Sequence, residues 1–298
     1  MKLLAILIAL CVTYLFDFRG RWLRDHWFDR YCDWIRSRSF FDPKSQARTL
    51  LFEVGAPVLV FGILLCWLGD WLFGLVGLVM HVAVLLFALD RRDLSTDLAL
   101  FRAAAAREDL QAALHVAEQS GLVVPGQPVQ SRADLSQTVV SRVLARRLEC
   151  GFSVLFWYLV LGPVAALAVV LLRLVRERSP TAADFDLGGQ LMGFIHWLPA
   201  RVLAFTFCLV GDFSATAPVA VASVRNPSMP PVDVLGSAAA ASCPALAVPT
   251  AADAADSEMG EQAAQVERQL DAVVGLLNRS LVLWLGSLAL WTLFAGAG

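Results

Sequence analysis

Charged side chains are scarce in this sequence, and it has none of the usual signatures of soluble enzymes. Asp, Glu, Lys and Arg make up 17% of the 298 residues, 58% are hydrophobic, and the net charge is −2. This composition excludes an ordinary soluble domain of this length and argues against nucleic acid as a partner. There is no Gly-x-Ser-x-Gly elbow, Walker A loop, His-Glu-x-x-His motif or dinucleotide fingerprint. No motif therefore indicates a catalytic or a cofactor-binding residue.

The cysteines lack the spacing of a disulfide framework or a metal site. No Cys-x-x-Cys pair is present, and three of the cysteines lie inside apolar runs, where they are expected to be packing residues. We predict neither a metal nor a cofactor. The six cysteines are Cys11, Cys32, Cys66, Cys150, Cys208 and Cys243.

A 40-residue stretch from Leu50 to Leu89 contains only three side chains that carry charge near pH 7, namely Glu53, Asp70 and His81. About 20 apolar residues in a helix cross a hydrocarbon core roughly 30 Å thick. The stretch therefore predicts a helical hairpin of two membrane spans, Leu50–Leu68 and Trp71–Leu89, with Gly69-Asp70 at its tip. His81, at mid-span, is either a functional group or a neutral histidine bonded to a neighbouring helix.

Three other apolar segments differ in how well they suit a span. Met1–Phe16 has no signal-peptide cleavage site and is expected to be retained, either crossing with help from its neighbours or lying as an interfacial or buried helix. Phe152–Leu172 has no charge and predicts a span kinked at Gly162-Pro163. Gln190–Val210 contains His196, Pro199 and Arg201, which favours a broken, re-entrant or interior helix and leaves full spanning open.

The C-terminal third changes character twice. Asn226–Ser257 is rich in Ala, Pro and Ser and has no aromatic residue, so we expect a flexible linker. Glu258–Asn278 predicts an amphipathic helix with Val266, Leu270, Val273 and Leu277 on one face, and it leads into a last apolar helix, Leu281–Phe294. This makes four predicted spans, with one or two more possible. The linker is periplasmic with four spans and cytoplasmic after a fifth crossing.

Two basic segments flank the hairpin. Asp17–Thr49 interleaves eight Lys/Arg with aromatic residues, as is typical of a headgroup region, and Asp90–Cys150 holds eight arginines in a helical, soluble pattern. The latter predicts helices from Ser95 or Thr96 to Ala106, over Asp109–Gln119 with Gly121 in a left-handed cap, and from about Ala133. A hairpin returns the chain to its starting side, so both segments are expected in the cytoplasm.

The predicted fold class is therefore all-α: a polytopic helical membrane protein with a small cytoplasmic helical subdomain. The predicted organisation has six parts. They are an N-terminal helix with a basic aromatic segment (1–49), the transmembrane hairpin (50–89), the cytoplasmic subdomain (90–150), a transmembrane helix with a broken apolar helix (151–215), the linker (216–257), and the amphipathic and last transmembrane helices (258–298).

A few polar residues are candidates for a ligand site. A charged Arg201 inside the protein needs a carboxylate, a cluster of backbone carbonyls or a phosphate-bearing ligand, and Glu149, Asp184 or Asp186 would be suitable carboxylates. The acidic and basic residues where the hairpin meets the cytoplasm could line a pocket for an anionic sugar-peptide or nucleotide, but interfacial anchoring by Arg91 and Arg92 explains the same residues without a ligand and is the favoured interpretation. The candidate set is Arg91, Arg92, Asp97, Arg102, Glu149, His196 and Arg201.

Two stretches carry a resemblance to a known family. They are His81–Leu122, which reads HVAVLLFALDRRDLSTDLALFRAAAAREDLQAALHVAEQSGL, and Phe152–Leu174, which reads FSVLFWYLVLGPVAALAVVLLRL and is followed by HWLPARVLAF from His196. Together they resemble the AmpE family, the inner-membrane proteins of the β-lactamase induction system, over about residues 50 to 215. The family is a distant relative of the CobD/CbiB enzymes, which attach an aminopropanol arm to cobyric acid.

The resemblance implies a non-catalytic regulatory or sensory role in cell-wall stress and β-lactam resistance, linked to muropeptide recycling, in the bacterial inner membrane. The implied partners are the lipid bilayer and either a muropeptide-recycling or β-lactam-response protein or an anionic cell-wall metabolite. The alternative is a CobD/CbiB-like ligase or synthase in divergent form, which would need Asp90, Asp93, Asp97 and Glu149 to converge. The E-N-x-x-D stretch of those enzymes is largely absent here, since its first positions fall on Ala145 and Arg146.

Overall fold

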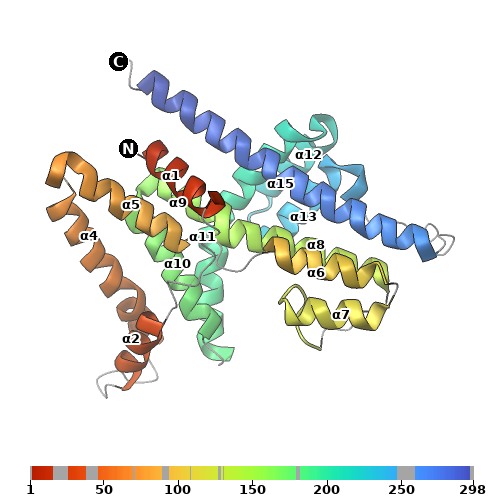
Figure 1. Cartoon of the computed structure of the whole chain (residues 1–298), viewed down its shortest axis with the longest axis horizontal. Coiled ribbons are helices and arrows are strands. Elements are labelled where there is room, and N and C mark those ends of the chain that lie inside the picture. The colour runs from red at the N-terminus through yellow and green to blue at the C-terminus, as the bar shows by residue number, and fades with distance from the viewer. Residues whose placement is uncertain are drawn as a thin grey trace. The chain divides into compact units, whose positions relative to one another are not determined.

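The computed structural model describes residues 2–15, 26–37, 46–69, 71–88, 94–107, 109–126, 129, 131–178, 182–246 and 259–295. Every regular element within these ranges is helical, which confirms the all-α prediction (Figure 1). The chain divides into two compact units. The first unit comprises residues 1–92 and 149–196, and the second comprises residues 93–148 and 197–298.

Among the described residues, three helices are long and apolar enough to cross a membrane, so the chain is a multi-pass membrane protein. They are Ala47–Leu68, Gly188–Val210 and Ala264–Trp291, and two shorter apolar helices are Lys2–Thr13 and Leu75–Ala88. The first of the three exposes large apolar side chains, including Leu59, Ile63 and Trp67. Exposed apolar surface of this kind suits contact with lipid.

The first unit is built around a helical hairpin with further helices packed on it. α1 packs on α5, and α10 packs on α5, α4 and α9. Its elements are α1 (Lys2–Leu15), α2 (His26–Ser37), α3 (Gln46–Leu50), η1 (Leu51–Gly55, a π-helical turn), α4 (Ala56–Leu68), η2 (Trp71–Gly74), α5 (Leu75–Ala88), η3 (Leu148–Phe152, also π-helical), α9 (Ser153–Leu161), α10 (Pro163–Arg178) and α11 (Ala182–Val210) as far as His196.

The predicted hairpin is present, but its second arm is shorter than expected. The chain turns at Gly69, and Gly77 of α5 lies so close to it that a Cβ there would be 2.7 Å from the Gly69 carbonyl oxygen. The returning arm begins with the 3₁₀ turn η2, so α5 has only 14 residues and falls short of the predicted full span.

The prediction of a single kinked span over Phe152–Leu172 is wrong. Gly162 has a φ of 89°, and the segment forms two helices, the 9-residue α9 and the 16-residue α10. Pro163 has no N–H to continue the ladder of hydrogen bonds, and glycine adopts the left-handed backbone that ends α9. Neither helix alone has the length of a membrane span.

Of the alternatives open over Gln190–Val210, a broken, re-entrant or interior helix, the broken form is wrong, because α11 runs without interruption through Pro199. Half of the apolar window of this helix is buried, which matches the interior alternative. A proline in a helix leaves the carbonyl four residues earlier without its donor. Here that carbonyl belongs to Ile195, and the indole Nε1 of Trp157 donates to it at 3.1 Å. The side chain on α9 thus replaces the missing backbone donor, and the helix continues.

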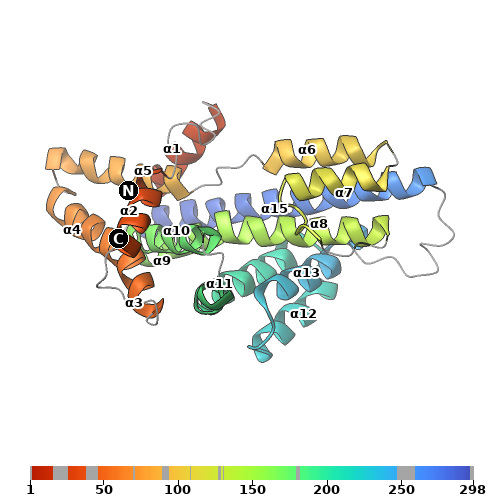
Figure 2. The ribbon, with the colours of Figure 1, turned by 90° about the horizontal axis from the view of Figure 1, so that it is seen from below.

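The second unit is a bundle in which α6, α7, α8 and α15 lie side by side (Figure 2). Asp109 caps α7 by accepting from Gln111 N and Ala112 N, and Gly121 after its end has a φ of 68°. Gly121 confirms the predicted left-handed cap, and Asp109 adds an N-cap that the sequence analysis did not predict. The elements are α6 (Leu94–Ala105), α7 (Leu110–Gln119), α8 (Arg132–Arg147), the end of α11, α12 (Phe213–Arg225), α13 (Pro231–Ser242), η4 (Pro244–Leu246) and α15 (Met259–Ala295).

The two predicted C-terminal helices are one 37-residue helix, α15. Its predicted apolar face is confirmed, since Val266, Leu270, Val273 and Leu277 are all buried. This face packs on α8, with a smaller contact to α6.

The predicted flexible linker is wrong for the part of it that the structure describes. Residues 226–246 form a turn, α13 and η4, and Val234, Leu235, Ala238 and Ala239 of α13 are buried against α12 and α8. Alanine and glycine bury little area singly but let backbones approach closely, and the side chain of Ser242 lies against Gly211. The rest of the predicted linker, residues 247–257, lies outside the described residues.

Candidate functional site

Arg201 is held by the backbone of its own unit. It is 2% exposed, and its guanidinium donates to the carbonyl oxygens of Ser223, Trp197 and Asn226 at 3.1 Å and to that of Met229 at 3.5 Å. Of the three partners that the sequence allowed, the structure shows the carbonyl cluster. Arg201 therefore ties α11 to the end of α12 and the turn that follows it.

The other candidates from the sequence do not meet in one pocket within the described residues. Arg146 of α8 pairs with Asp97 at 3.0 Å, and Arg102 pairs with Asp271 of α15 at 2.6 Å, so both candidates join helices of the second unit. Glu149 belongs to the first unit, in the π-helical turn η3. Arg91 and Arg92 lie outside the described residues.

His196 forms a buried pair with Ser153 in the first unit. Ser153 is fully buried, His196 is 4% exposed, and the serine Oγ lies 2.7 Å from the imidazole Nδ1. The other ring nitrogen, Nε2, is buried without a hydrogen bond. When Ser153 donates to Nδ1, the neutral imidazole carries its proton on Nε2, where it is available to an acceptor.

Two arginines of α10 lie near enough to act on this histidine through their charge. The charges of Arg176 and Arg173 on α10 reach the imidazole of His196. Arg173 is 7% exposed, and its Nε and Nη1 atoms make no hydrogen bond. We call Arg173 of α10 and His196 of α11, together with Ser153 at the start of α9, the α10–α11 polar cluster.

His81 is bonded within the first unit rather than free. Its Nδ1 lies 2.8 Å from the hydroxyl oxygen of Tyr158, and the two rings meet edge to face. Tyr158 is fully buried. This contact matches the alternative in which a neutral histidine is bonded to a neighbouring helix.

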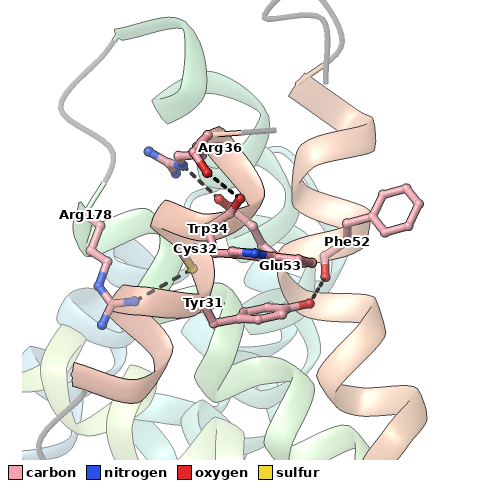
Figure 3. Close-up of polar contacts among 8 residues, drawn as sticks. Tyr31, Cys32, Trp34, Arg36, Phe52, Glu53 and Arg178 are labelled. Atoms are coloured by element: carbon pink, nitrogen blue, oxygen red, sulfur yellow. Dashed lines mark hydrogen bonds and ion pairs between the residues drawn. The ribbon is translucent and has the colours of Figure 1, made fainter. Parts of the chain in front are cut away.

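A second polar cluster joins α2 to the π-helical turn η1 (Figure 3). Glu53 is 1% exposed, and its Oε1 accepts from the Arg36 Nε at 2.8 Å, while Oε2 has no hydrogen-bond partner. The Tyr31 hydroxyl donates to the Phe52 carbonyl at 2.9 Å. π-Helical turns are rare and often occur at functional positions. Glu53 is therefore a further candidate functional residue, in addition to those predicted from the sequence.

Cys32 lies in the same α2–η1 cluster. Arg178 of α10 lies 3.9 Å from its Sγ and stacks over the Phe28 ring at 4.8 Å. Burial raises the pKa of the Cys32 thiol to about 11, and the carboxylate of Glu53 adds to the rise. Burial also raises the pKa of Tyr31. A thiol with so high a pKa is a poor nucleophile at neutral pH, which favours a packing role for Cys32.

Two apolar cavities open beside these clusters in the first unit. One, of about 540 Å³, lies between α4, α5 and α10, with Trp27 and Tyr31 of α2 on its wall. The other, of about 370 Å³, lies between α3, η1, α10 and α11, and its lining includes Leu172 and Ile195. Both linings are almost wholly apolar, which suits a hydrocarbon chain. Over the described part of the chain, no group of three His, Cys, Asp or Glu side chains could hold a metal ion.

Sequence reasoning missed most residues of the two polar clusters. Arg36 is counted only among the basic residues of its segment, and Arg178, Ser153 and Arg173 are not singled out. Ser153 and His196 are 43 positions apart, and Arg36 and Glu53 are 17 apart, so no local spacing indicates either contact. The one available signal was Glu53, a carboxylate within an apolar run.

Comparison with known proteins gives two matches. The model of a family described as "Regulatory signalling modulator protein AmpE" matches residues 1–252. The cobalamin biosynthesis protein CobD of Chromobacterium violaceum is 30% identical over 152 residues, which cover 46% of this chain and 45% of that protein. The chain thus spans less than half the length of this curated relative. No solved structure matches the chain.

Proposed function

The chain belongs to the AmpE family of regulatory signalling modulator proteins, and from this premise we propose that it is a non-catalytic regulator or sensor of the bacterial inner membrane. We further propose that it acts in β-lactamase induction and in signalling of cell-wall stress by muropeptides. The observation that carries the proposal is the family match, which extends over residues 1–252 of 298.

The contacts of the charged candidates support a regulatory role over a catalytic one. Arg201 is held by four backbone carbonyls, and Asp97 and Arg102 are held in ion pairs between helices. Groups bound in this way stabilise packing and are poorly placed to attack or protonate a substrate.

A regulator needs an element that a ligand or partner binds unequally in two arrangements. The division between the two units runs through two helical segments, after His196 in α11 and after Leu148 in η3. Ser153 follows η3 directly, and its partner His196 is the last residue of the first unit. We propose that ligand binding at the α10–α11 polar cluster acts on both segments through this hydrogen bond.

Deletion of the gene in its native host tests the proposal. β-Lactamase activity is measured with and without a sub-inhibitory β-lactam, after complementation with wild type, Ser153→Ala or the exposed-surface control Arg225→Gln. We expect the deletion to alter induction, wild type and Arg225→Gln to restore it, and Ser153→Ala to restore it only in part at equal membrane abundance. Unchanged induction in the deletion strain would contradict the regulatory role.

The similarity to CobD favours one alternative, a membrane ligase or synthase of the CobD/CbiB type in divergent form. Of the four carboxylates that it would need, Asp97 is paired with Arg146, and Asp90 and Asp93 lie outside the described residues. Expression of this chain in a host that lacks its own CobD tests the alternative. Restored cobalamin-dependent growth would establish it, and no growth beside a growing CobD control would reject it.

A further inference from the structure

Arg173 is a buried cation with an unusually poor set of partners. Its Nε and Nη1 make no hydrogen bond, and the Oε1 of its ion-pair partner Glu177 lies 3.7 Å from Nε. That distance is too long for a hydrogen bond, and the Glu177 side chain is 64% exposed. Burying a guanidinium with its donors unsatisfied is costly, and within the described part of the chain no acceptor bonds Nε or Nη1.

The neighbouring histidine also lacks an acceptor. His196 is bonded to Ser153 through Nδ1, and its buried Nε2 has no partner. Leu172 and Ile195, the chain neighbours of Arg173 and His196, line one cavity between α10 and α11, and the charges of Arg176 and Arg173 both reach the ring of His196. A group that accepts hydrogen bonds and carries negative charge would satisfy both.

We propose that the α10–α11 polar cluster binds a phosphate group, with Arg173 as the cation and His196 as a neutral donor. A phosphate accepts several hydrogen bonds at once, and arginine is the side chain best suited to it. Arg178 is not part of this site, because it already pairs with Asp29. This proposal rests on the proposed function for its biological meaning and names the ligand class of that regulator.

The position of the cluster suits a phosphate attached to an apolar chain. Arg173 follows directly on the apolar part of α10, in the half that also carries Arg176, as expected at a headgroup boundary. The cavity of about 370 Å³ is lined by Leu172 and Ile195, the chain neighbours of Arg173 and His196, and its other lining residues are also apolar or small. A free phosphate compound shares the headgroup chemistry but leaves this cavity unused.

Direct binding to the purified full-length chain tests the proposal. Isothermal titration with inorganic phosphate forms one arm, and native mass spectrometry with phosphatidic acid against phosphatidylcholine forms the other. We expect saturable binding of one phosphate group per chain in at least one arm, and binding in the lipid arm alone would identify a headgroup as the source. Arg173→Gln is expected to weaken binding about tenfold or more, because it removes the only charged donor of the cluster.

Arg225→Gln is the matched control, because Arg225 is an exposed arginine on α12, and it should bind as wild type does. If Arg173→Gln does not fold, Arg173→Lys and Ser153→Ala replace it. Each of these variants should lose less phosphate affinity than is expected for Arg173→Gln. Wild-type affinity in all three cluster variants would overturn the proposal. Absence of saturable binding to wild type in both arms would do so too.

One internal competitor is tested separately. Asp184 and Asp186 lie upstream of His196 in α11, and their side chains lie outside the described part of the structure. If Asp184→Asn with Asp186→Asn destabilises the chain and wild type binds no phosphate, an internal ion pair is the missing acceptor and the proposal fails. If wild type binds no phosphate but still restores induction to the deletion strain, the phosphate ligand is rejected and the proposed function stands. If the deletion strain itself shows normal induction, the proposed function is rejected.

Discussion

The guanidinium of Arg201 lies over the indole ring of Trp197, with its Cζ 4.1 Å from the ring centroid, and also donates to the Trp197 carbonyl. The stacking satisfies the face of the guanidinium while the carbonyls satisfy its edge. An arginine thus lies in an apolar helix of span length, and no carboxylate of the described residues pairs with it.

Replacement of Arg201 should therefore destabilise the second unit. Arg201→Ala removes the donors of carbonyls at the end of α12, and we expect a loss of about 3 kcal/mol in the free energy of unfolding. Arg201→Lys keeps the charge but not the planar fork, so a loss of about 1–2 kcal/mol is expected. Thermal unfolding in detergent measures both, beside Arg225→Ala, an exposed arginine for which a change within about 0.5 kcal/mol is expected. Equal stabilities of Arg201→Ala and Arg225→Ala would show that the carbonyl cluster contributes nothing.

The indole of Trp157 and the ring of Pro199 should be energetically coupled. Trp157→Phe leaves the carbonyl oxygen of Ile195 without a donor. In the wild-type background this change should lower the free energy of unfolding by about 1–2 kcal/mol. In Pro199→Ala, the new backbone N–H can donate to Ile195, so the same change should cost less than about 0.5 kcal/mol beyond its packing effect. A double-mutant cycle on unfolding free energies measures the difference. Additive costs would mean that the indole does not replace the backbone donor.

The alkaline stability of the first unit should depend on Cys32. Its folded pKa of about 11 is raised from 9.0, so the protonated thiol stabilises the fold below pH 9, and this contribution is lost as pH rises toward 11. Two pKa units correspond to about 3 kcal/mol at most. We expect the unfolding free energy of wild type to fall more steeply between pH 9 and 11 than that of Cys32→Ser. In Cys32→Ser the unfolding free energy should still fall somewhat with pH, because the pKa of Tyr31 is also raised in the folded state.

Glu53 provides an independent test of the same cluster. Glu53→Gln removes the second largest cause of the rise and should lower the pKa of Cys32, although burial keeps it above its ordinary value. Iodoacetamide labelling followed by mass spectrometry reports the pKa from the pH dependence of the rate. An unchanged labelling profile in Glu53→Gln would show that the carboxylate does not act on the thiol.

Close backbone packing in the region 211–246 predicts opposite effects for two glycines. A Cβ at Gly211 would lie 2.7 Å from both the Cβ and the carbonyl oxygen of Ser242, so Gly211→Ala should cost about 1–3 kcal/mol. A Cβ at Gly236, within α13, meets nothing within 4 Å, and Gly236→Ala should be neutral or stabilise by up to about 1 kcal/mol. Unfolding of both variants decides whether this region is folded. Equal, negligible effects would restore the flexible-linker interpretation.

Local features of the sequence were reliable predictors where one face or one cap decides the structure. Gly121 predicted the C-terminal end of α7 because capping involves only neighbouring residues. The spacing of Leu270 and Val273 predicted the buried face of α15 because helical periodicity is a local property. For Arg201 the chemistry of the side chain restricted the partners to three kinds, but not to one.

Composition misled where packing partners come from distant parts of the chain. The alanine-rich residues of α13 are ordered because α12 and α8 supply the surface that buries them, and no property of the segment itself shows this. Pro199 predicted a break because its missing donor is local, whereas the replacement comes from Trp157, 42 positions away.

The sequence alone determined that this is an all-helical membrane protein and carried the motifs of its family, since apolar length, helical periodicity and caps act over a few neighbouring residues. Only the tertiary structure decided which apolar runs form single long helices and which polar groups meet. The α10–α11 polar cluster and the Arg36–Glu53 pair depend on contacts between separate helices, because hydrogen bonds form over about 3 Å in space whatever the separation along the chain.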